Sequence, residues 1–186
     1  MNEYSRKYPL FSLCGLNCGL CPRYQTEGSS KCPGCGGPDF HLRHPACAVM
    51  TCNKKHDHVE YCFQCSSYPC KRYSETSIRD SFISYKNVLS DFGKASQFGI
   101  RTYQVELNKK IKILEFLIKN YNDGRRKSFY CIAVNLIKLS ALEQMMETID
   151  REIKEQDLDL KGKIILVVEL FESTASKENI ELKLRK

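Results

Sequence analysis

The feature that most constrains this chain is how its cysteines are distributed. Ten of the eleven cysteines lie between Cys14 and Cys70, and all four histidines lie in the same stretch. Apolar residues there are scattered without a sustained period, and turn formers recur, as in PGCGGP at 33–38. A segment of this size with little apolar content needs cross-links or a metal to stay folded. We therefore expect bonds to sulfur, rather than a hydrophobic core of its own, to hold this segment together.

The N-terminal sequence predicts that these thiols stay reduced. MNEYSRKYPLFSL is broken by Pro9 and Ser12 and has neither the apolar core nor the small-residue cleavage site of a secretory signal. The best apolar run, residues 164–170, falls short of the ~18–20 residues that a membrane span needs. We therefore expect a cytoplasmic protein without a membrane span. In that compartment an odd number of thiols indicates metal binding or catalysis rather than a disulfide framework.

The ten cysteines come in five groups, three of which contain a C-x2-C pair. Such a turn brings two sulfurs about one tetrahedral edge apart, while backbone N–H groups inside the turn donate to the thiolates. Cys32-Pro33-Gly34-Cys35 is the clearest case, because the proline fixes one dihedral angle and the glycine allows a positive φ. The spacing predicts two or more zinc ions held by cysteines of one set: Cys14, Cys18, Cys21, Cys32, Cys35, Cys47, Cys52, Cys62, Cys65 and Cys70.

Other metals and ligands stay open at this point. The triplet Cys14, Cys18 and Cys21 also has the spacing by which radical enzymes that use S-adenosylmethionine hold a four-iron cluster, but the chain is too short for their barrel. Another kind of iron–sulfur protein remains the alternative to zinc, because thiolates hold either metal. Ten cysteines exceed the eight of two four-cysteine sites, so a third ion could draw on histidines whose role the sequence leaves undecided: His41, His44, His56 and His58.

From Tyr73 onward the sequence predicts helices. Apolar residues recur every three or four positions over 103–121, which predicts an amphipathic helix, and Asn-Asp-Gly at 122–124 ends it. Residues 128–138 are apolar almost all round, which predicts a buried helix, with a strand as the competing interpretation.

Three further elements are expected towards the C-terminus. Ser140 and Glu143 stand three residues apart, as in a capping box, and predict a helix over 141–156. Another helix is expected over 160–176, and the strict alternation in 180–185 predicts a short strand or an extended tail.

These patterns predict a mainly α fold in which a small, irregular, cysteine-rich zinc-binding lobe over residues 1–72 is followed by a helical bundle over residues 73–186. Cys131 stands alone within an apolar helix, so we expect it in the core rather than as a nucleophile. The formal net charge of +7 falls to +3 with two four-thiolate zinc sites, because each site adds −2. The basic excess is therefore weak evidence for an acidic partner.

The sequence NDGRRKSFY, residues 122–130, gathers three cations at the start of a predicted helix, which is an unfavourable place for positive charge. The simplest interpretation is a solvated loop. The alternative is that these cations face the thiolates of the lobe or an anionic ligand.

The cysteine motifs resemble those of a known family. CGLNCGLCP at 14–22, the C-x2-C pair at 32–35, Cys47 and Cys52, and CFQCSSYPC at 62–70 follow its order and spacing. This is an uncharacterised, cysteine-rich family of bacteria and archaea, domain-of-unknown-function family 3795. The resemblance implies zinc binding through all ten cysteines from Cys14 to Cys70, and it supplies no reaction.

Three functions are compatible with the sequence. The first is a cytoplasmic zinc-binding protein whose structural four-cysteine sites fold the lobe, acting as a binding or regulatory module, with a protein partner compatible. The second is an iron–sulfur or redox enzyme with a cleft between lobe and bundle; the sequence does not decide whether the chain is an enzyme. The third is a zinc-dependent nucleic-acid-binding protein that uses cations and aromatic rings of the lobe: Arg23, Lys31, Arg43, Lys54, Lys55, Lys71 and Arg72, with Tyr24, Tyr61, Phe63 and Tyr68.

Overall fold

The structure is a computed structural model, and it describes residues 4–44, 46–56, 58–74 and 79–185. Within these ranges the chain forms eight α-helices and two short 3-10 helices, with no strand. The predicted mainly α fold is confirmed. None of the helices in the described ranges has the length and apolar character needed to cross a membrane.

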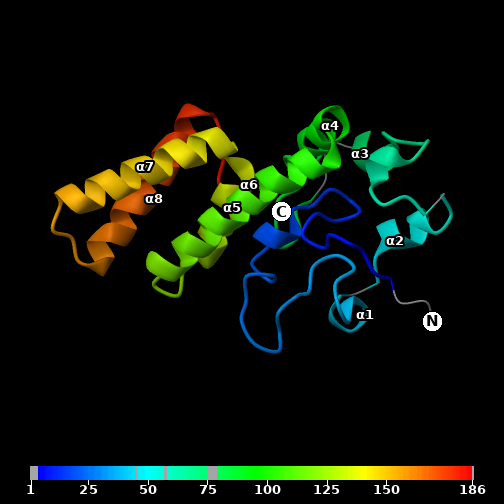
Figure 1. Cartoon of the computed structure of the whole chain (residues 1–186), viewed down its shortest axis with the longest axis horizontal. Helices are drawn as coiled ribbons and strands as arrows, with labels where there is room; N and C mark the ends of the chain where they lie inside the picture. The colour runs from blue at the N-terminus through cyan, green and yellow to red at the C-terminus, as the bar shows by residue number, and fades with distance from the viewer. Residues whose placement is uncertain (1–3, 45, 57, 75–78, 186) are drawn as a thin grey trace.

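The cysteine-rich lobe consists of loops joined by very short helices, which lie together at one end of the molecule (Figure 1). Its elements are η1 (Cys18–Leu20), α1 (Phe40–Arg43), α2 (Ala48–Asn53), η2 (Cys62–Gln64) and α3 (Lys71–Ser74). None of them is long enough to be stable through its own hydrogen bonds. The lobe must therefore be held by contacts between segments that are distant in sequence.

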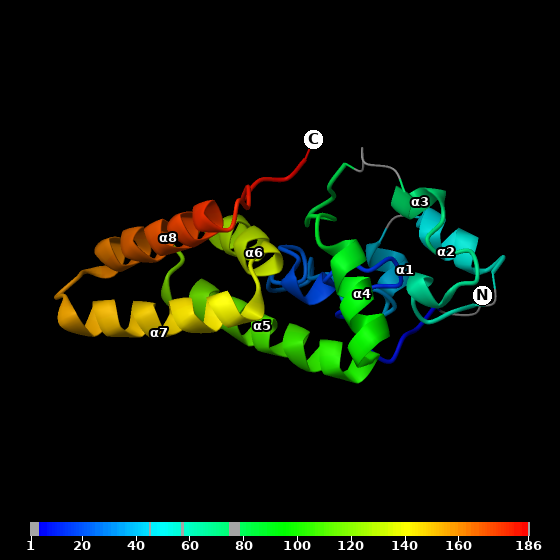
Figure 2. The same cartoon turned by 90° about the horizontal axis from the view of Figure 1, so that it is seen from above.

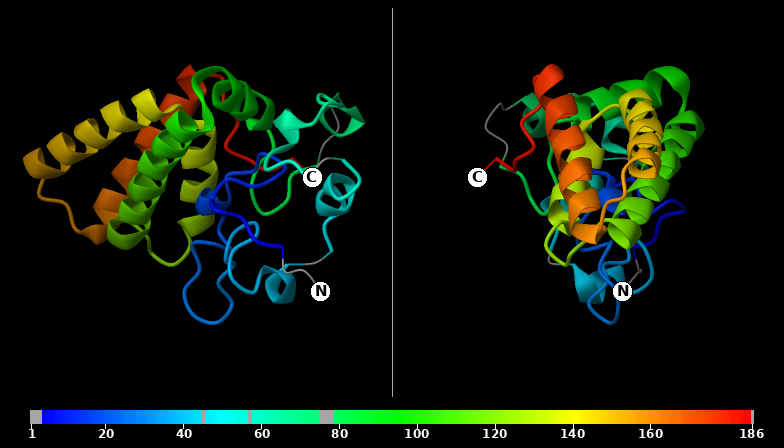
Figure 3. Two further views of the ribbon diagram at one scale, coloured as in Figure 1. Left: turned by 45° about the vertical axis from the view of Figure 1, so that its right-hand side comes forward. Right: turned by 90° about the vertical axis from the view of Figure 1, so that its left-hand side faces the viewer.

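The helical part has five longer helices, of which α5 is the central one. It packs against α4, α6, α7 and the 3-10 helix η1 of the lobe. Helices α7 and α8 lie side by side and extend away from the lobe (Figures 2 and 3). The bounds are α4 (Val88–Phe98), α5 (Ile100–Asn120), α6 (Lys127–Leu136), α7 (Leu139–Glu155) and α8 (Leu160–Lys177).

The predicted helices are found close to their expected bounds. Within 128–138 the helix α6 ends at Leu136, so the predicted helix is confirmed up to that residue and the competing strand is wrong. Helix α7 begins before Ser140, whose side chain does not cap it, so the predicted capping box is wrong. Residues 180–185 form no strand but an irregular tail. The tail is tied back by Arg185, whose guanidinium donates to Asp80 at 2.9 Å.

One hydrophobic core runs through both parts of the chain. Phe11 of the lobe is fully buried, with its ring centroid 4.6 Å from that of Tyr103 on α5 and 5.7 Å from that of Phe92 on α4. Leu20 of η1 is also fully buried in this core. The lobe therefore buries some of its large apolar side chains against the helices, whereas Phe40 packs on His44 within the lobe.

Polar contacts of Arg6 join the N-terminal segment of the lobe to a later loop. The side chain of Arg6 is almost fully buried, and it donates to the carbonyl of Phe11 at 2.7 Å and to the carbonyl of Glu60 at 2.8 Å. Its guanidinium also lies 4.6 Å from the ring centroid of Tyr61. A buried guanidinium is costly without such partners. These contacts therefore hold the N-terminal segment and the loop around Glu60 in fixed positions relative to each other.

Candidate metal centre and a cleft in the helical part

The opening motif CGLNCG is shaped to fit against the helices. Gly15 has a φ of +88°, and a Cβ placed there would lie 2.8 Å from the ring of Phe92. A Cβ on Gly19 would overlap the side chain of Ile111 on α5. Both glycines are therefore needed for the loop to approach α4 and α5 this closely. The sequence analysis assigned roles to the cysteines of this motif and missed those of its glycines.

Asn17, between two of the candidate ligands, is the polar connection from the motif to the helices. Its Nδ2 donates to Asp91 Oδ2 and to Asn135 Oδ1, both at 3.0 Å, and its Oδ1 accepts from the Tyr103 hydroxyl at 2.8 Å. All of these side chains are buried. Asn17 therefore joins α4, α5 and α6 to the cysteine loop. Its position in the sequence, between Cys14 and Cys18, gave no indication of this role.

All eleven cysteines are free thiols, so the lobe is not a disulfide framework. Burial raises the pKa of the thiols of Cys14, Cys18 and Cys21, and it raises the pKa of Cys62 to about 11. Hydrogen bonds act against burial at some of them. For Cys21, the backbone amides of Arg23 and Tyr24 lower the pKa in part. Amide donors around sulfur are typical of sites that hold thiolates.

Four cysteines from the second half of the lobe line one small cavity of about 30 Å³. Cys52 lies in α2, Cys62 begins η2, Cys65 follows η2 directly, and Cys70 precedes α3. The short helices therefore bring together thiols spread over 19 positions of the sequence. A cavity of this size has room for a single ion or water molecule.

Asn53 also lines this cavity and carries an unsatisfied atom. Its Nδ2 donates to the carbonyl of Val59 at 3.1 Å, but its buried Oδ1 has no hydrogen-bond partner. A buried acceptor without a partner costs roughly 1–3 kcal/mol. A donor or a cation in the cavity would offset that cost.

The other six candidate ligands lie outside this cavity. Neighbouring thiols contribute to the raised pKa values of three of them: Cys35 and Cys47 act on Cys14, Cys35 and Cys14 act on Cys18, and Cys32 acts on Cys21. Cys35 is also bound into the lobe through its amide, which donates to the Pro9 carbonyl at 2.9 Å. In the part of the chain that the structure describes, no three His, Cys, Asp or Glu side chains stand in an arrangement that could hold a metal ion.

The structure also locates four other residues that the sequence singled out. His56 lines the four-cysteine cavity, and His44 stacks on Phe40 with ring centroids 4.7 Å apart. Cys131 is fully buried in α6, as expected for a core residue. In the basic sequence at 122–130, Lys127 turns to the lobe and donates to Thr26 Oγ1 at 3.0 Å.

Of the four aromatic rings that the sequence singled out in the lobe, half-buried Tyr24 lies beside the Lys31 ammonium, outside the core, and the other three pack against the core. Tyr61 is 2% exposed, Phe63 packs on Tyr61 and Phe92, and the ring centroid of Tyr68 lies 5.7 Å from that of Phe92. These rings are therefore engaged in the core, where they are not free to stack on nucleic-acid bases.

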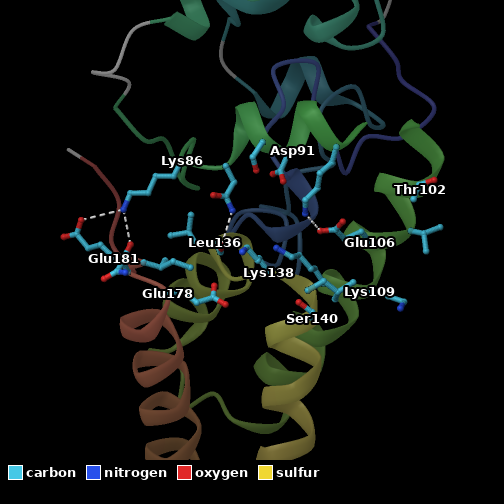
Figure 4. A pocket seen from close by; sticks show the side chains of 18 residues that line it. Lys86, Asp91, Thr102, Glu106, Lys109, Leu136, Lys138, Ser140, Glu178 and Glu181 are labelled. Atoms are coloured by element: carbon cyan, nitrogen blue, oxygen red, sulfur yellow. Dashed lines mark hydrogen bonds and ion pairs between the residues drawn. The ribbon is translucent and has the colours of Figure 1, made fainter. Parts of the chain in front are cut away.

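The helical part contains a cleft of about 980 Å³, and residues 86–181 alone line it (Figure 4). It lies where α4, α5, the end of α6, the start of α7 and the end of α8 meet. The lobe contributes none of its wall, so this cavity is not the predicted cleft between lobe and bundle, which stays a prediction.

Two buried charges form part of the wall of this cleft. Lys110 and Asp91 are each 6% exposed. The Lys110 ammonium donates to the carbonyls of Ile137 at 2.7 Å and Asn135 at 3.3 Å, at the end of α6. Burial lowers the pKa of Lys110 to about 8, although Asp91 acts in the opposite direction. Burial likewise raises the pKa of Asp91.

Comparison with known proteins supports the family resemblance. Residues 10–75 match the model of a family described as protein of unknown function (DUF3795). The cysteine-rich part of this chain is thus similar to that family, and the matched range contains all ten candidate ligands. Neither the curated proteins nor the solved structures contain a match to the chain.

Proposed function

We propose that this protein binds zinc through its cysteine-rich lobe, and that the metal has a structural role there, in a chain that serves as a binding or regulatory module. The observation that carries the proposal is the single small cavity lined by Cys52, Cys62, Cys65 and Cys70. Four thiolates and no open position are typical of structural zinc sites, in which Zn–S distances are about 2.3 Å.

The residues around the cavity fit such an ion. All four thiols are free, and Cys62 and Cys65 form a C-x2-C pair, which suits two neighbouring corners of a tetrahedron. The unsatisfied Oδ1 of Asn53 would be stabilised by a positive charge in the cavity. Because the four side chains do not yet converge on one point, binding requires them to turn inward. The bound metal would supply cross-links between α2, η2 and the loop before α3.

The remaining six cysteines would hold at least one more ion. Cys14, Cys18, Cys21, Cys32, Cys35 and Cys47 provide the thiols, and the amides around Cys21 favour the thiolate form. An iron–sulfur cluster is the competing occupant, since thiolates also hold iron.

Elemental analysis tests the proposal on protein purified without added metal. We expect about two zinc ions per chain in the wild type, one ion fewer in Cys65→Ser, and an unchanged content in the control Cys131→Ala, whose thiol is in the core. Detection of iron together with visible absorption would instead indicate an iron–sulfur cluster in place of zinc. A folded wild-type lobe that carries no metal would refute the proposal.

A further inference from the structure

The cleft of the helical part has a charge distribution that its own side chains do not balance. Nine charged side chains line it, five lysines and four carboxylates: Lys86, Lys94, Lys109, Lys110 and Lys138, with Asp91, Glu106, Glu178 and Glu181. Its volume of about 980 Å³ is that of a site for a small organic molecule. The question is which of these charges a ligand could reach.

Three of the four carboxylates are already engaged, whereas Glu178 makes no ion pair or side-chain hydrogen bond within the described residues. Glu106 pairs with Lys94 at 2.5 Å, and Glu181 pairs with Lys86 at 3.6 Å. Asp91 accepts a hydrogen bond from Asn17. Asp91 and Glu178 both act electrostatically on Lys110, whose ammonium is held by two backbone carbonyls.

Two lysines are left available at the rim. Lys138, exposed on the turn between α6 and α7, makes no ion pair with any carboxylate in the described ranges. Lys109 pairs only with Glu143, and those side chains are 57% and 48% exposed. An exposed pair of this kind is worth roughly 0–1 kcal/mol, so a ligand can displace it at little cost. Figure 4 shows Lys138, Ser140 and Lys109 along the same side of the cleft.

We propose that this cleft binds a small organic molecule through an oxyanion group, a phosphate or a carboxylate, held by Lys138 and Lys109 beside the Ser140 hydroxyl. Ammonium groups form strong, charge-assisted hydrogen bonds with such oxygens. The apolar side chains of Leu136, Leu139 and Ile180 also line the cleft and would contact the rest of the molecule. No residue of the cysteine lobe lines this site.

Titration calorimetry with two probes, inorganic phosphate and hexanoate, tests the site on the full-length chain. We expect at least one probe to bind the wild type. Binding should weaken about tenfold or more in Lys138→Met and by a smaller factor in Lys109→Met, because each variant loses a charge-assisted hydrogen bond to the probe. The matched control is Lys112→Met, an exposed lysine on the same helix as Lys109 that does not line the cleft.

The two probes identify the source of the oxyanion. Binding of phosphate alone assigns a phosphorylated ligand, and binding of hexanoate alone assigns a carboxylate with an apolar chain; either result supports the site. Binding of neither probe at a Kd of about 1 mM or better would overturn the proposal. Equal affinities for Lys138→Met and Lys112→Met would also overturn it. The side chain that is changed is exposed in all three variants, and circular dichroism serves to check that each variant remains folded.

Discussion

The lobe and the helical part reach a folded state in different ways. The helical part has five helices of 10 to 21 residues, whose apolar faces bury Leu107, Leu114, Val134 and Phe171. The lobe has helices of only three to six residues and ten thiols. Burial of apolar surface stabilises the first part. The second part lacks the helix length for that, and the proposed metal sites would supply cross-links instead.

The comparison also shows that the two parts are not independent. Phe11, Leu20 and Tyr61 of the lobe belong to the same core cluster as the helices. Gly15 and Gly19 allow the cysteine loop to approach α4 and α5, and Asn17 bonds to them. One loop therefore combines candidate metal ligands with the residues that attach the lobe to the helices.

Removal of the metal should have the largest effect, and it should affect the lobe much more than the helical part. Structural zinc contributes roughly 10–16 kcal/mol of apparent binding free energy in small domains, so a strong chelator should unfold the loops around Cys52, Cys62, Cys65 and Cys70. Helices α7 and α8, at the far end of the molecule, should persist. Hydrogen exchange resolved by segment measures both. Unchanged protection in the lobe after complete removal of metal would contradict this prediction.

Phe11→Ala should destabilise the lobe and the helices together. The fully buried ring contacts Tyr103 and Phe92, and loss of a core phenylalanine costs about 3–5 kcal/mol. Urea unfolding followed by circular dichroism measures the change. Phe98→Ala is the control, because that ring is 61% exposed and its loss should cost less than about 1 kcal/mol. Equal effects of the two variants would mean that Phe11 does not join the parts.

Asn17→Ala should lower the free energy of unfolding by about 3 kcal/mol. The variant leaves the buried Asp91 carboxylate and Tyr103 hydroxyl each without one partner, at roughly 1–3 kcal/mol per group. Thermal unfolding of protein with its full metal content measures the loss. The exposed Asn120→Ala serves as the control. If Asn17→Ala lost metal but not stability, Asn17 would act on the metal site rather than on the attachment to the helices.

Lys110→Met should change how stability depends on pH, with the smallest effect of the four. The pKa of Lys110 is lowered by burial from 10.5 to about 8 in the folded protein. Between pH 8 and 10.5 the unfolded chain therefore binds a proton that the folded chain does not, so this group makes the wild type more stable as the pH rises.

The predicted change for Lys110 is at most about 3 kcal/mol across that pH range. The measurement is the difference in unfolding free energy between wild type and Lys110→Met at pH 8 and at pH 10. Taking the difference removes the contribution of tyrosines and thiols that titrate in both proteins. A difference that stays constant or falls with pH would contradict the assigned burial of the charge.

The long helices could be predicted because their signal is local. Apolar residues at helical spacing marked α5 to within three residues of its observed start, and Asn-Asp-Gly marked its end. The predicted cap at Ser140 failed because α7 begins earlier, after Lys138. A helix end depends on which turn packs against its neighbours, and such packing is not a local property.

The candidate site was predictable by residue type but not by grouping. Spacing predicted all ten cysteines of the lobe as ligands, whereas the cavity that Cys52 shares with Cys62, Cys65 and Cys70 depends on how α2 and α3 fold around η2. The cleft gave no sequence signal at all, since Lys109, Lys138 and Glu178 come from three separate helices or turns. Scattered lysines are typical of any solvated surface.

The sequence by itself determined the helices and which residues are the candidate sulfur donors, because both follow from neighbours in the chain. Only the tertiary structure decided that four of those thiols share a cavity, that Gly15, Asn17 and Gly19 serve the attachment to the helices, and that lysines gather at one cleft. These depend on contacts between residues tens of positions apart. Such contacts are set by how the whole core packs, which no local pattern encodes.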